Sequence, residues 1–411
     1  MDAIRSASLN EQRFIISEAL GLSHCVITAA KYTSMLSAES QLESLISKAV
    51  KHCIDVHPVL STNIEDANGD HPRLTQVDDI DLDHHLTHVK SQDTGLKEEQ
   101  QIKNFLESAH GLRLPTAGER PQWRVYVSES LATDSRAACF YLAFVFSHVF
   151  TDGMSGIAFH SSFLRSMNGV QTTLEWEHRD QQPGRMPLPP IETAGNLTIS
   201  WSYLVTILVQ EFLPTWLASA LGVQVDNLNE FWTVPNSTVK GVLQACRKHN
   251  ARLTSLLNYL TARALCKSLS ARGQSYQKIK VGSAIDLRRA LGKGQGCMAN
   301  WVSVLMETFT ISEHDGRITD HDWDVIRQST VHLAKASSSL ADQPIGLIKY
   351  ITNMKQWTHE RASQPATVSF GTSNLGVFNG ATCKEGVRVV AGVWRRWCRH
   401  SRVPLRVRPL T

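Results

Sequence analysis

Residues 144–153 read Phe-Val-Phe-Ser-His-Val-Phe-Thr-Asp-Gly, and this stretch indicates how the surrounding chain folds. The apolar, aromatic-rich run from Cys139 to Phe146 is typical of a buried strand. Beyond it, until Asn168-Gly169, apolar residues recur at helical spacing, namely Ile157, Phe163, Leu164 and Met167. The pattern predicts a strand, a short connection and a helix, with His148 where the chain leaves the sheet.

The predicted connection contains residues whose chemistry suits a reaction. His148 is a candidate general base, because imidazole titrates near neutrality and partial burial readily shifts its pKa. Asp152 can cap the following helix or bind a cation. Gly153 permits a backbone conformation or a close approach that a Cβ would block. The alternative for His148 is a buried histidine that only forms hydrogen bonds within a core.

The order His-x-x-x-Asp-Gly after an apolar strand resembles the signature of the acyltransferase superfamily that includes chloramphenicol acetyltransferase, plant acyl-CoA acyltransferases and peptide-synthetase condensation domains. Further stretches between Arg5 and about Phe378 are similar to one branch, the fungal alcohol O-acetyltransferase family. These stretches are Glu11, Leu20-Gly21, Ala30-Lys31-Tyr32, His57-Pro58-Val59-Leu60, Trp123-Arg124, Leu253-Thr254-Ser255-Leu256-Leu257, Met298-Ala299-Asn300 and Ser373-Asn374-Leu375-Gly376. The resemblance implies an α/β (α+β) fold like that of chloramphenicol acetyltransferase, with two subdomains, mixed sheets and an active-site tunnel between the halves.

The resemblance also implies the reaction of an acetyl-CoA:alcohol O-acetyltransferase. In that reaction His148 would take the proton of the acceptor hydroxyl while its oxygen attacks the thioester directly, without a covalent enzyme intermediate. The expected partners are an acyl-CoA co-substrate and a small-molecule alcohol. Neither a bound cofactor nor a metal is expected.

Other residue roles follow from the same resemblance. Asp152 is expected to point away from the substrates and to pair with Arg288. The two residues would then hold in place the connection that contains His148, which we call the histidine loop (residues 147–152). The developing oxyanion needs a donor from another strand. Ser373 and Asn374 are the candidate donors, with Thr372 as a third, and all three are expected along the tunnel.

Two alternatives to this reaction stay open. The first is an acyltransferase that acts on an amine or on a carrier-bound thioester. Condensation domains carry a second histidine directly before the catalytic one, and Ser147 in that position disfavours a peptide synthetase but not an amine acceptor. The second alternative is a catalytically dead, truncated member of the superfamily that acts as a binding protein.

Length and composition describe a globular protein. The chain has 411 residues, of which 42% are apolar and 19% are charged, so it can bury a large core and is expected to form two domains. A net charge of +4 is small for this length and argues against a large nucleic-acid surface. Eight scattered cysteines and an N-terminus without the apolar core of a signal peptide predict a cytoplasmic protein with reduced thiols, expected to be a monomer.

The clearest linker is the stretch around residues 180–190, which is rich in proline. It divides the chain into an N-terminal half (1–182) with the histidine motif, a crossover linker (183–198) and a C-terminal half (199–378). Residues 379–411 depart from the family pattern, because they end in a basic, tryptophan-rich tail without clear periodicity. Such a tail could bind anionic lipid or nucleic acid. The preferred interpretation is a segment outside the fold.

The most hydrophobic run is residues 199–221. Gln210, Glu211 and Pro214 interrupt it, which argues against a helix that spans a membrane. The run predicts a partly exposed amphipathic helix that contacts a membrane peripherally or lines an acyl tunnel. A buried packing helix is the alternative.

The segment 78–88 is rich in aspartate and histidine and invites a metal-binding interpretation. His84 and His88 have the spacing of ligands on a helix. However, Ile80, Leu82 and Leu86 alternate as in a strand, which would place the two histidines too far apart to share a metal ion. The sequence therefore predicts a strand here and no metal site.

Overall fold

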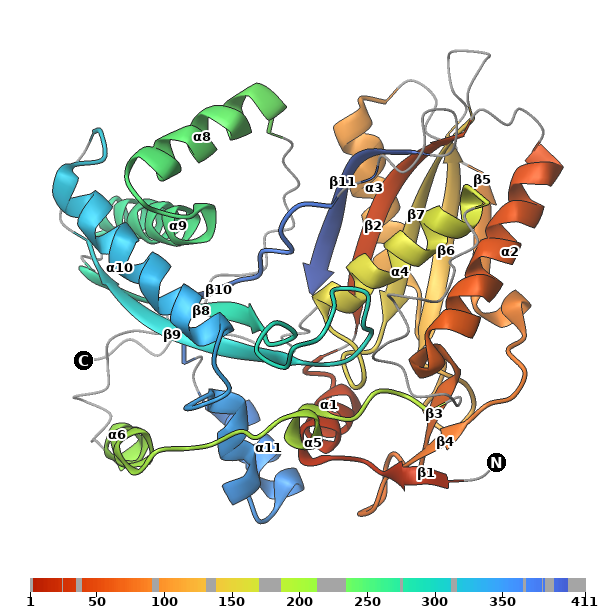
Figure 1. Ribbon diagram of the computed structural model, residues 1–411, viewed down its shortest axis with the longest axis horizontal. Coiled ribbons are helices and arrows are strands. Elements are labelled where there is room, and N and C mark those ends of the chain that lie inside the picture. The colour runs from red at the N-terminus through yellow and green to blue at the C-terminus, as the bar shows by residue number, and fades with distance from the viewer. Residues whose placement is uncertain are drawn as a thin grey trace.

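The computed structural model describes residues 3–23, 25–34, 39–90, 96–130, 138–169, 186–212, 234–273, 276–311, 316–364, 367–378, 380 and 388–397. These residues form two lobes, each built on a sheet with helices packed against it (Figure 1). A small third sheet lies below the first lobe, near the N-terminus.

The sheet of the first lobe has its central strand directly before His148. Its strands, in spatial order, are β11 (Arg388–Trp397), β2 (Val26–Ser34), β7 (Ala138–Phe146), β6 (Trp123–Ser130) and β5 (Leu86–Lys90). Neighbours are antiparallel except for β5 and β6, which are parallel. Because β7 pairs with β2 along its whole length and with β6 from Cys139 onwards, its last residue, Phe146, is held from both sides by Val26 and Trp123.

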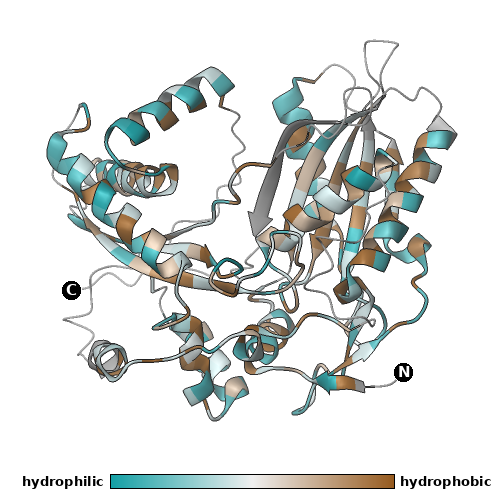
Figure 2. Ribbon diagram, in the orientation of Figure 1, coloured by the Kyte–Doolittle hydropathy of each residue, from teal (hydrophilic) through white to brown (hydrophobic). Residues whose placement is uncertain are grey.

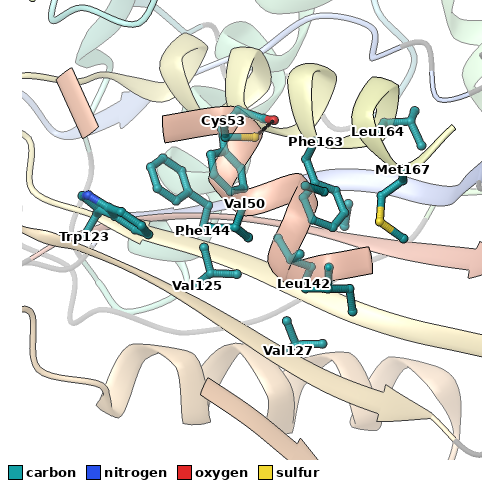
Figure 3. Packing of buried hydrophobic residues seen from close by; sticks show 14 of the residues in the cluster. Val50, Cys53, Trp123, Val125, Val127, Leu142, Phe144, Phe163, Leu164 and Met167 are labelled. Atoms are coloured by element: carbon teal, nitrogen blue, oxygen red, sulfur yellow. Dashed lines mark hydrogen bonds between the residues drawn. The ribbon is translucent and has the colours of Figure 1, made fainter. Parts of the chain in front are cut away.

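Both faces of β7 are buried. One face lies against α2 (Glu39–Val56) and α4 (Gly153–Met167), where Phe144 packs among Val50, Cys53 and Phe163 (Figure 3). The other face lies against α3 (Glu98–Gly111). A strand covered on both faces reads as a continuous apolar run, so the buried strand predicted from residues 139–146 is confirmed.

Helix α4 approaches β2 closely at Gly156. A Cβ built at this position would lie 2.8 Å from Thr28 Cβ, deep inside van der Waals contact, and Thr28 is fully buried on β2. In the next turn of α4, the ring of His160 hydrogen-bonds to the carbonyl oxygen of Thr28 through Nε2, at 3.1 Å. The glycine is therefore explained by close packing of helix on strand.

We expect Gly156→Ala to lower the free energy of unfolding by about 1–3 kcal/mol, the typical cost of overpacking a filled core. The matched control is Gly241→Ala on α8 (Asn236–Lys248), where nothing lies within 4 Å of the added Cβ. There we expect no change or a gain of up to about 1 kcal/mol, because alanine favours helix over glycine. Chemical denaturation measures both variants, and equal effects at the two sites would contradict the packing argument.

The second lobe contains a three-stranded sheet in the order β10 (Phe370–Thr372), β8 (Lys278–Asp286) and β9 (Val302–Thr310). The pair β8–β9 is antiparallel and the pair β10–β8 is parallel. Helices α9 (Leu253–Ser270) and α10 (Asp320–Ser337) pack on this sheet, and α8 packs against α9. Figure 2 shows hydrophobic and hydrophilic residues alternating around α8 and α10, as expected for helices with one face on a core.

The N-terminal segment joins the lobes from below. The small sheet has the order β1 (Ala3–Ser6), β4 (Arg73–Gln76) and β3 (Thr62–Glu65), and α1 (Leu9–Ala19) follows β1. Helix α1 contacts α11 (Met354–Ser363) and the 3₁₀ helix η3 (Pro344–Tyr350). The remaining short elements are η1 (Pro58–Ser61), η2 (Leu82–His84) and α5 (Ile191–Ala194).

The structure differs from the expectation that residues 379–411 lie outside the fold. Residues 388–397 form β11, which pairs antiparallel with β2 from Arg388↔Thr33 to Trp397↔Val26, with two irregularities in register. The pairing corrects the expectation for these ten residues. The reason is that β2 would otherwise present an open edge, and an unpaired edge readily accepts another strand. Residues 398–411 lie outside the described part of the chain.

The hydrophobic run predicted as a helix forms α6 (Trp201–Phe212), and residues 213–221 of it lie outside the described part. Trp201 and Val205 are 81% and 52% exposed, so the start of α6 is partly exposed, as predicted, and the alternative of a buried packing helix does not hold there. Among the described residues, no helix combines the length and the apolar character needed to cross a bilayer.

The strand predicted over residues 78–88 is wrong for its first part. Asp81 accepts a hydrogen bond from the backbone N–H of Asp83 and begins the turn η2, and β5 starts only at Leu86. His84 Nδ1 lies 2.7 Å from Asp81 Oδ2 on the exposed side of this turn. A short aspartate side chain that caps a turn competes with extended backbone, and the apolar alternation did not reveal this.

Candidate active site

His148 lies just past the end of β7, where the chain turns towards α4. The histidine is 5% exposed. The turn is closed by two hydrogen bonds around Ser147: Val149 N–H donates to its Oγ (3.1 Å), and the Thr151 hydroxyl donates to its carbonyl oxygen (2.8 Å). The expected arrangement of strand, histidine, turn and helix is therefore present.

Asp152 caps helix α4. Its Oδ1 accepts a hydrogen bond from the Ser155 backbone N–H (2.9 Å), and Ser155 Oγ accepts one from the Asp152 N–H (3.1 Å), which makes a reciprocal capping box. Gly153 is the first residue of α4 and does not have a positive φ. A left-handed backbone therefore does not explain this glycine, and close approach by a substrate or by another segment stays a prediction.

The Asp152 carboxylate also forms a buried ion pair with the second lobe. Arg288 Nη1 lies 2.8 Å from Asp152 Oδ2, and its Nη2 lies 2.9 Å from Oδ1, so the contact is bidentate. The backbone N–H of Trp301 donates to the same Oδ2 at 3.1 Å. Burial alone raises the pKa of Asp152, but the charge and hydrogen bonds of Arg288, with the Ser155 N–H, outweigh it and hold this pKa below its usual value.

Arg288 is completely buried, and its other donors are also satisfied. Its Nε donates to the Cys297 carbonyl oxygen (3.1 Å), its Nη2 to the Ala299 carbonyl oxygen (2.9 Å), and its Nη1 to Asp286 Oδ1 (2.9 Å). Although burial lowers the pKa of Arg288, Asp152 and Asp286 outweigh this and raise it above its usual value. The guanidinium thus binds both the histidine loop, through Asp152, and the segment between β8 and β9, through the carbonyl oxygens of Cys297 and Ala299.

The same segment holds the backbone of the histidine itself. Asn300 Nδ2 donates to the His148 carbonyl oxygen at 2.6 Å. Asn300 is buried in the turn that precedes β9. Its contact means that both ends of the loop, His148 and Asp152, are held by the second lobe.

Comparison with known proteins identifies the family. The family model described as "Alcohol acetyltransferase" matches residues 87–385. The chain belongs to the alcohol acetyltransferase family. The predicted family is therefore confirmed, and with it the expectation of an acyltransferase enzyme.

Relatives of this alcohol acetyltransferase family member include an uncharacterised protein of Schizosaccharomyces pombe, 22% identical over 91% of this chain and 82% of its own length. The probable alcohol acetyltransferase FCK4 of Fusarium pseudograminearum is 25% identical, over 64% of this chain and 57% of its own length. The probable alcohol acetyltransferase crmB of Aspergillus fumigatus is 21% identical, over 72% of this chain and 66% of its own length. The chain thus spans less than two thirds of each of these two probable acetyltransferases.

Solved structures agree in fold. The trichothecene 15-O-acetyltransferase TRI3 of Fusarium sporotrichioides has a TM-score of 0.61 at 10% identity, with 96% of this chain and 86% of TRI3 covered. The first condensation domain of the CDA synthetase also has a TM-score of 0.61, at 13% identity, with 96% and 87% covered. At these identities the likeness concerns the fold alone, and the predicted fold of two lobes with mixed sheets is confirmed.

The candidate oxyanion donors of this family member lie on the second lobe. Thr372, at the end of β10, has its Oγ1 3.2 Å from Ser283 Oγ on β8. Asn374 Nδ2 donates to Thr254 Oγ1 at 2.9 Å, near the start of α9. Ser373 and Asn374 are exposed. Their role as oxyanion donors stays a prediction.

A cavity lies beside the histidine loop, between the lobes. It is lined by Val149 and Phe150 of the loop, by Met298–Asn300 of the second lobe, and by Pro187–Pro190 of the predicted crossover. His148 is not among its lining residues, so this cavity does not test the expected tunnel. Within the described ranges, histidine, cysteine, aspartate and glutamate form no cluster of three or more that could hold a metal ion.

No role for Asn300 is predicted from the sequence, although Met298-Ala299-Asn300 resembles a family segment. A lone asparagine after a glycine-rich connector carries no local signal of its function. Its partner, the His148 carbonyl oxygen, lies 152 positions away in sequence. Only the tertiary structure brings the two together.

Proposed function

We propose that this alcohol acetyltransferase family member transfers an acetyl group from acetyl-CoA to the hydroxyl of a small-molecule alcohol, with His148 as the general base. One observation carries the proposal. His148 follows the central strand of one lobe, and Asn300 and Arg288 of the other lobe hold the two ends of its loop. The loop that contains His148 therefore lies where the lobes meet, which supports the proposal.

The neighbouring carboxylate is a poor candidate for the base. Asp152 is only 2% exposed, and both its oxygens accept hydrogen bonds, from Arg288, Ser155 and Trp301. A carboxylate that is stabilised in its charged form has little affinity for a substrate proton. Its role in the proposal is to position the histidine loop.

The proposed reaction needs a single proton relay. His148 takes the hydroxyl proton while the alcohol oxygen attacks the thioester carbonyl, and the carbonyl electrons move to the oxygen. When the tetrahedral intermediate collapses, the C–S bond breaks and the CoA sulfur receives the proton from His148. No covalent enzyme intermediate forms, and Ser373, Asn374 and Thr372 remain the candidate donors to the oxyanion.

The test is the release of free thiol from acetyl-CoA in the presence of a panel of primary and secondary alcohols. We expect thiol release that requires an alcohol and is matched by an equal amount of ester. Release that is equally fast without an alcohol would indicate a thioesterase. In the same assay, amines compete with the alcohols as acceptors, and a carrier-bound thioester competes with acetyl-CoA as the donor. A preference for amines would favour an amine acceptor, and a preference for the carrier-bound thioester would favour that donor.

The proposal includes a cytoplasmic monomer. It also includes peripheral membrane contact through residues 199–221, and the exposure of Trp201 and Val205 on α6 supports this contact. Replacing both residues by serine is expected to weaken binding to vesicles of phosphatidylcholine and phosphatidylserine several-fold, because burial of apolar side chains drives interfacial binding. Vesicle sedimentation measures this. Unchanged binding by the variant, or no binding by the wild type, would reject the contact.

A further inference from the structure

Helix α1 lies against the histidine loop. Phe14 on this helix is 9% exposed, and its ring stacks on the His148 imidazole with the centroids 4.5 Å apart and the planes inclined by 15°. Aromatic rings at this separation attract one another and restrict each other's rotation. Phe14 therefore limits how the His148 side chain can turn.

One helical turn later, Glu18 contacts the backbone of the same loop. Its Oε1 accepts a hydrogen bond from Ser147 Oγ at 2.7 Å, and the carboxyl also accepts the backbone N–H of His148. Gln122 Nε2, just before β6, lies 3.5 Å from the other carboxyl oxygen. Because residues four apart share one face of a helix, α1 contacts the ring and the peptide of His148 together.

The backbone of His148 is thus held on both sides. Glu18 of α1 accepts its N–H, and Asn300 of the second lobe donates to its carbonyl oxygen. Three contacts on one residue fix the direction in which the imidazole leaves the backbone. Such alignment matters because displacing a reacting group by about 1 Å can cost about 100-fold in rate.

Helix α1 is itself fixed at its start. Ser8 and Glu11 form a capping box, and Arg5 binds Glu11 through two contacts of 2.7 Å. The guanidinium of Arg13 lies 4.5 Å from the centroid of the Phe14 ring. These contacts keep the face with Phe14 and Glu18 in register with the histidine loop.

The Glu18 side chain is half-buried, and burial raises its pKa to about 8 despite the hydrogen bonds from Ser147, His148 and Gln122. The groups that contact it from the residue before β6 and from the loop after β7 are those same three residues, and the other charged residues of α1 are Glu11 and Arg13. Among the described residues, no lysine or arginine forms an ion pair with Glu18. A carboxyl whose pKa is raised in this way holds its proton more readily at neutral pH than an ordinary glutamate does, and glutamine resembles the protonated form.

We propose that Phe14 and Glu18 are positioning residues that align His148 for the acetyl transfer, an inference that rests on the proposed function. The two side chains act through the imidazole ring and the backbone of His148, and neither is assigned a contact with substrate. Loss of either is expected to lower kcat more than it changes KM for acetyl-CoA or the alcohol.

The test measures kcat and KM for the wild type, Glu18→Ala, Glu18→Gln, Phe14→Leu and the control Glu107→Ala, which changes an exposed residue of α3. We expect kcat to fall about 10- to 100-fold in Glu18→Ala and about 2- to 10-fold in Phe14→Leu, with KM within about twofold. Glu18→Gln is expected to recover most of kcat at pH 7, and the control to match the wild type.

The pH profile separates positioning from a purely structural role. In the wild type, kcat should change around pH 8 as Glu18 ionises, and this inflection should be absent in Glu18→Gln. Wild-type kcat in Phe14→Leu together with an unchanged profile in Glu18→Gln would overturn the inference, even if Glu18→Ala fails to fold. An inactive wild type would instead reject the proposed function, so the two failures are distinguishable.

Discussion

Replacing His148 by alanine is expected to lower the rate of acetyl transfer by about 10²- to 10⁴-fold, the usual contribution of a general base. The reason is that the acceptor hydroxyl is weakly acidic and needs a base in the transition state. The expected loss lies mainly in kcat, because substrate binding does not depend on the proton transfer. Thiol release from acetyl-CoA with the best alcohol of the panel measures the effect.

The control for this variant is His359→Ala, which removes an exposed histidine from α11 and should leave the rate unchanged. His148 is buried against Phe14, so circular dichroism and the melting temperature must show that the variant is folded. A folded His148→Ala that retains more than about a tenth of the wild-type rate would contradict the general-base assignment.

Replacing Arg288 by methionine is expected to lower the free energy of unfolding by about 3–5 kcal/mol, because it leaves a buried carboxylate without its counter-charge. Asp152 would keep only the N–H donors of Ser155 and Trp301 and the Ser155 hydroxyl. Asp152→Asn should cost less, because Arg288 would still bind Asp286 and two carbonyl oxygens. The double variant should cost less than the sum of the single variants, since they share one interaction.

The matched control is Glu98→Gln, which breaks the more exposed pair between Lys31 and Glu98 and should cost less than about 1 kcal/mol.

The dependence of the free energy of unfolding on pH has a definite sign. The pKa of Asp152 is lower in the folded state than in the unfolded state. The ion pair with Arg288 therefore stabilises the wild type fully at pH values above the unfolded-state pKa, and this stabilisation is lost as the pH falls through the folded-state pKa. In Arg288→Met the unpaired carboxyl protonates more readily. The stability gap to the wild type should therefore narrow between pH 7 and pH 4, and a constant gap would contradict this account.

The local pattern of the sequence was sufficient for the centre of the candidate site. An apolar run covered on both faces predicts β7, and the return to helical spacing after Gly153 predicts α4, so the place of His148 between them follows from residues 139–169. The pairing of Asp152 with Arg288 came from resemblance to a family, because no local pattern links residues 136 positions apart.

The edge of the first sheet could not be predicted in the same way. Residues 388–397 follow a segment without periodicity, and their strand exists only because β2 offers hydrogen-bonding groups along its free side. Backbone pairing depends weakly on side-chain type, so the basic and aromatic composition suggested a tail. The turn at Asp81 was missed for a related reason, because one capping side chain outweighs an apolar alternation.

The sequence by itself determined β7 and α4, the place of the histidine between this strand and this helix, and the family. Those features depend on neighbours along the chain, on apolar periodicity and on a short motif. Only the tertiary structure decided that Phe14, Glu18 and Asn300 surround His148, and that β11 completes the sheet. The physical reason is that these contacts join distant segments through single hydrogen bonds, ring stacking and backbone pairing, which leave no periodic trace in the sequence.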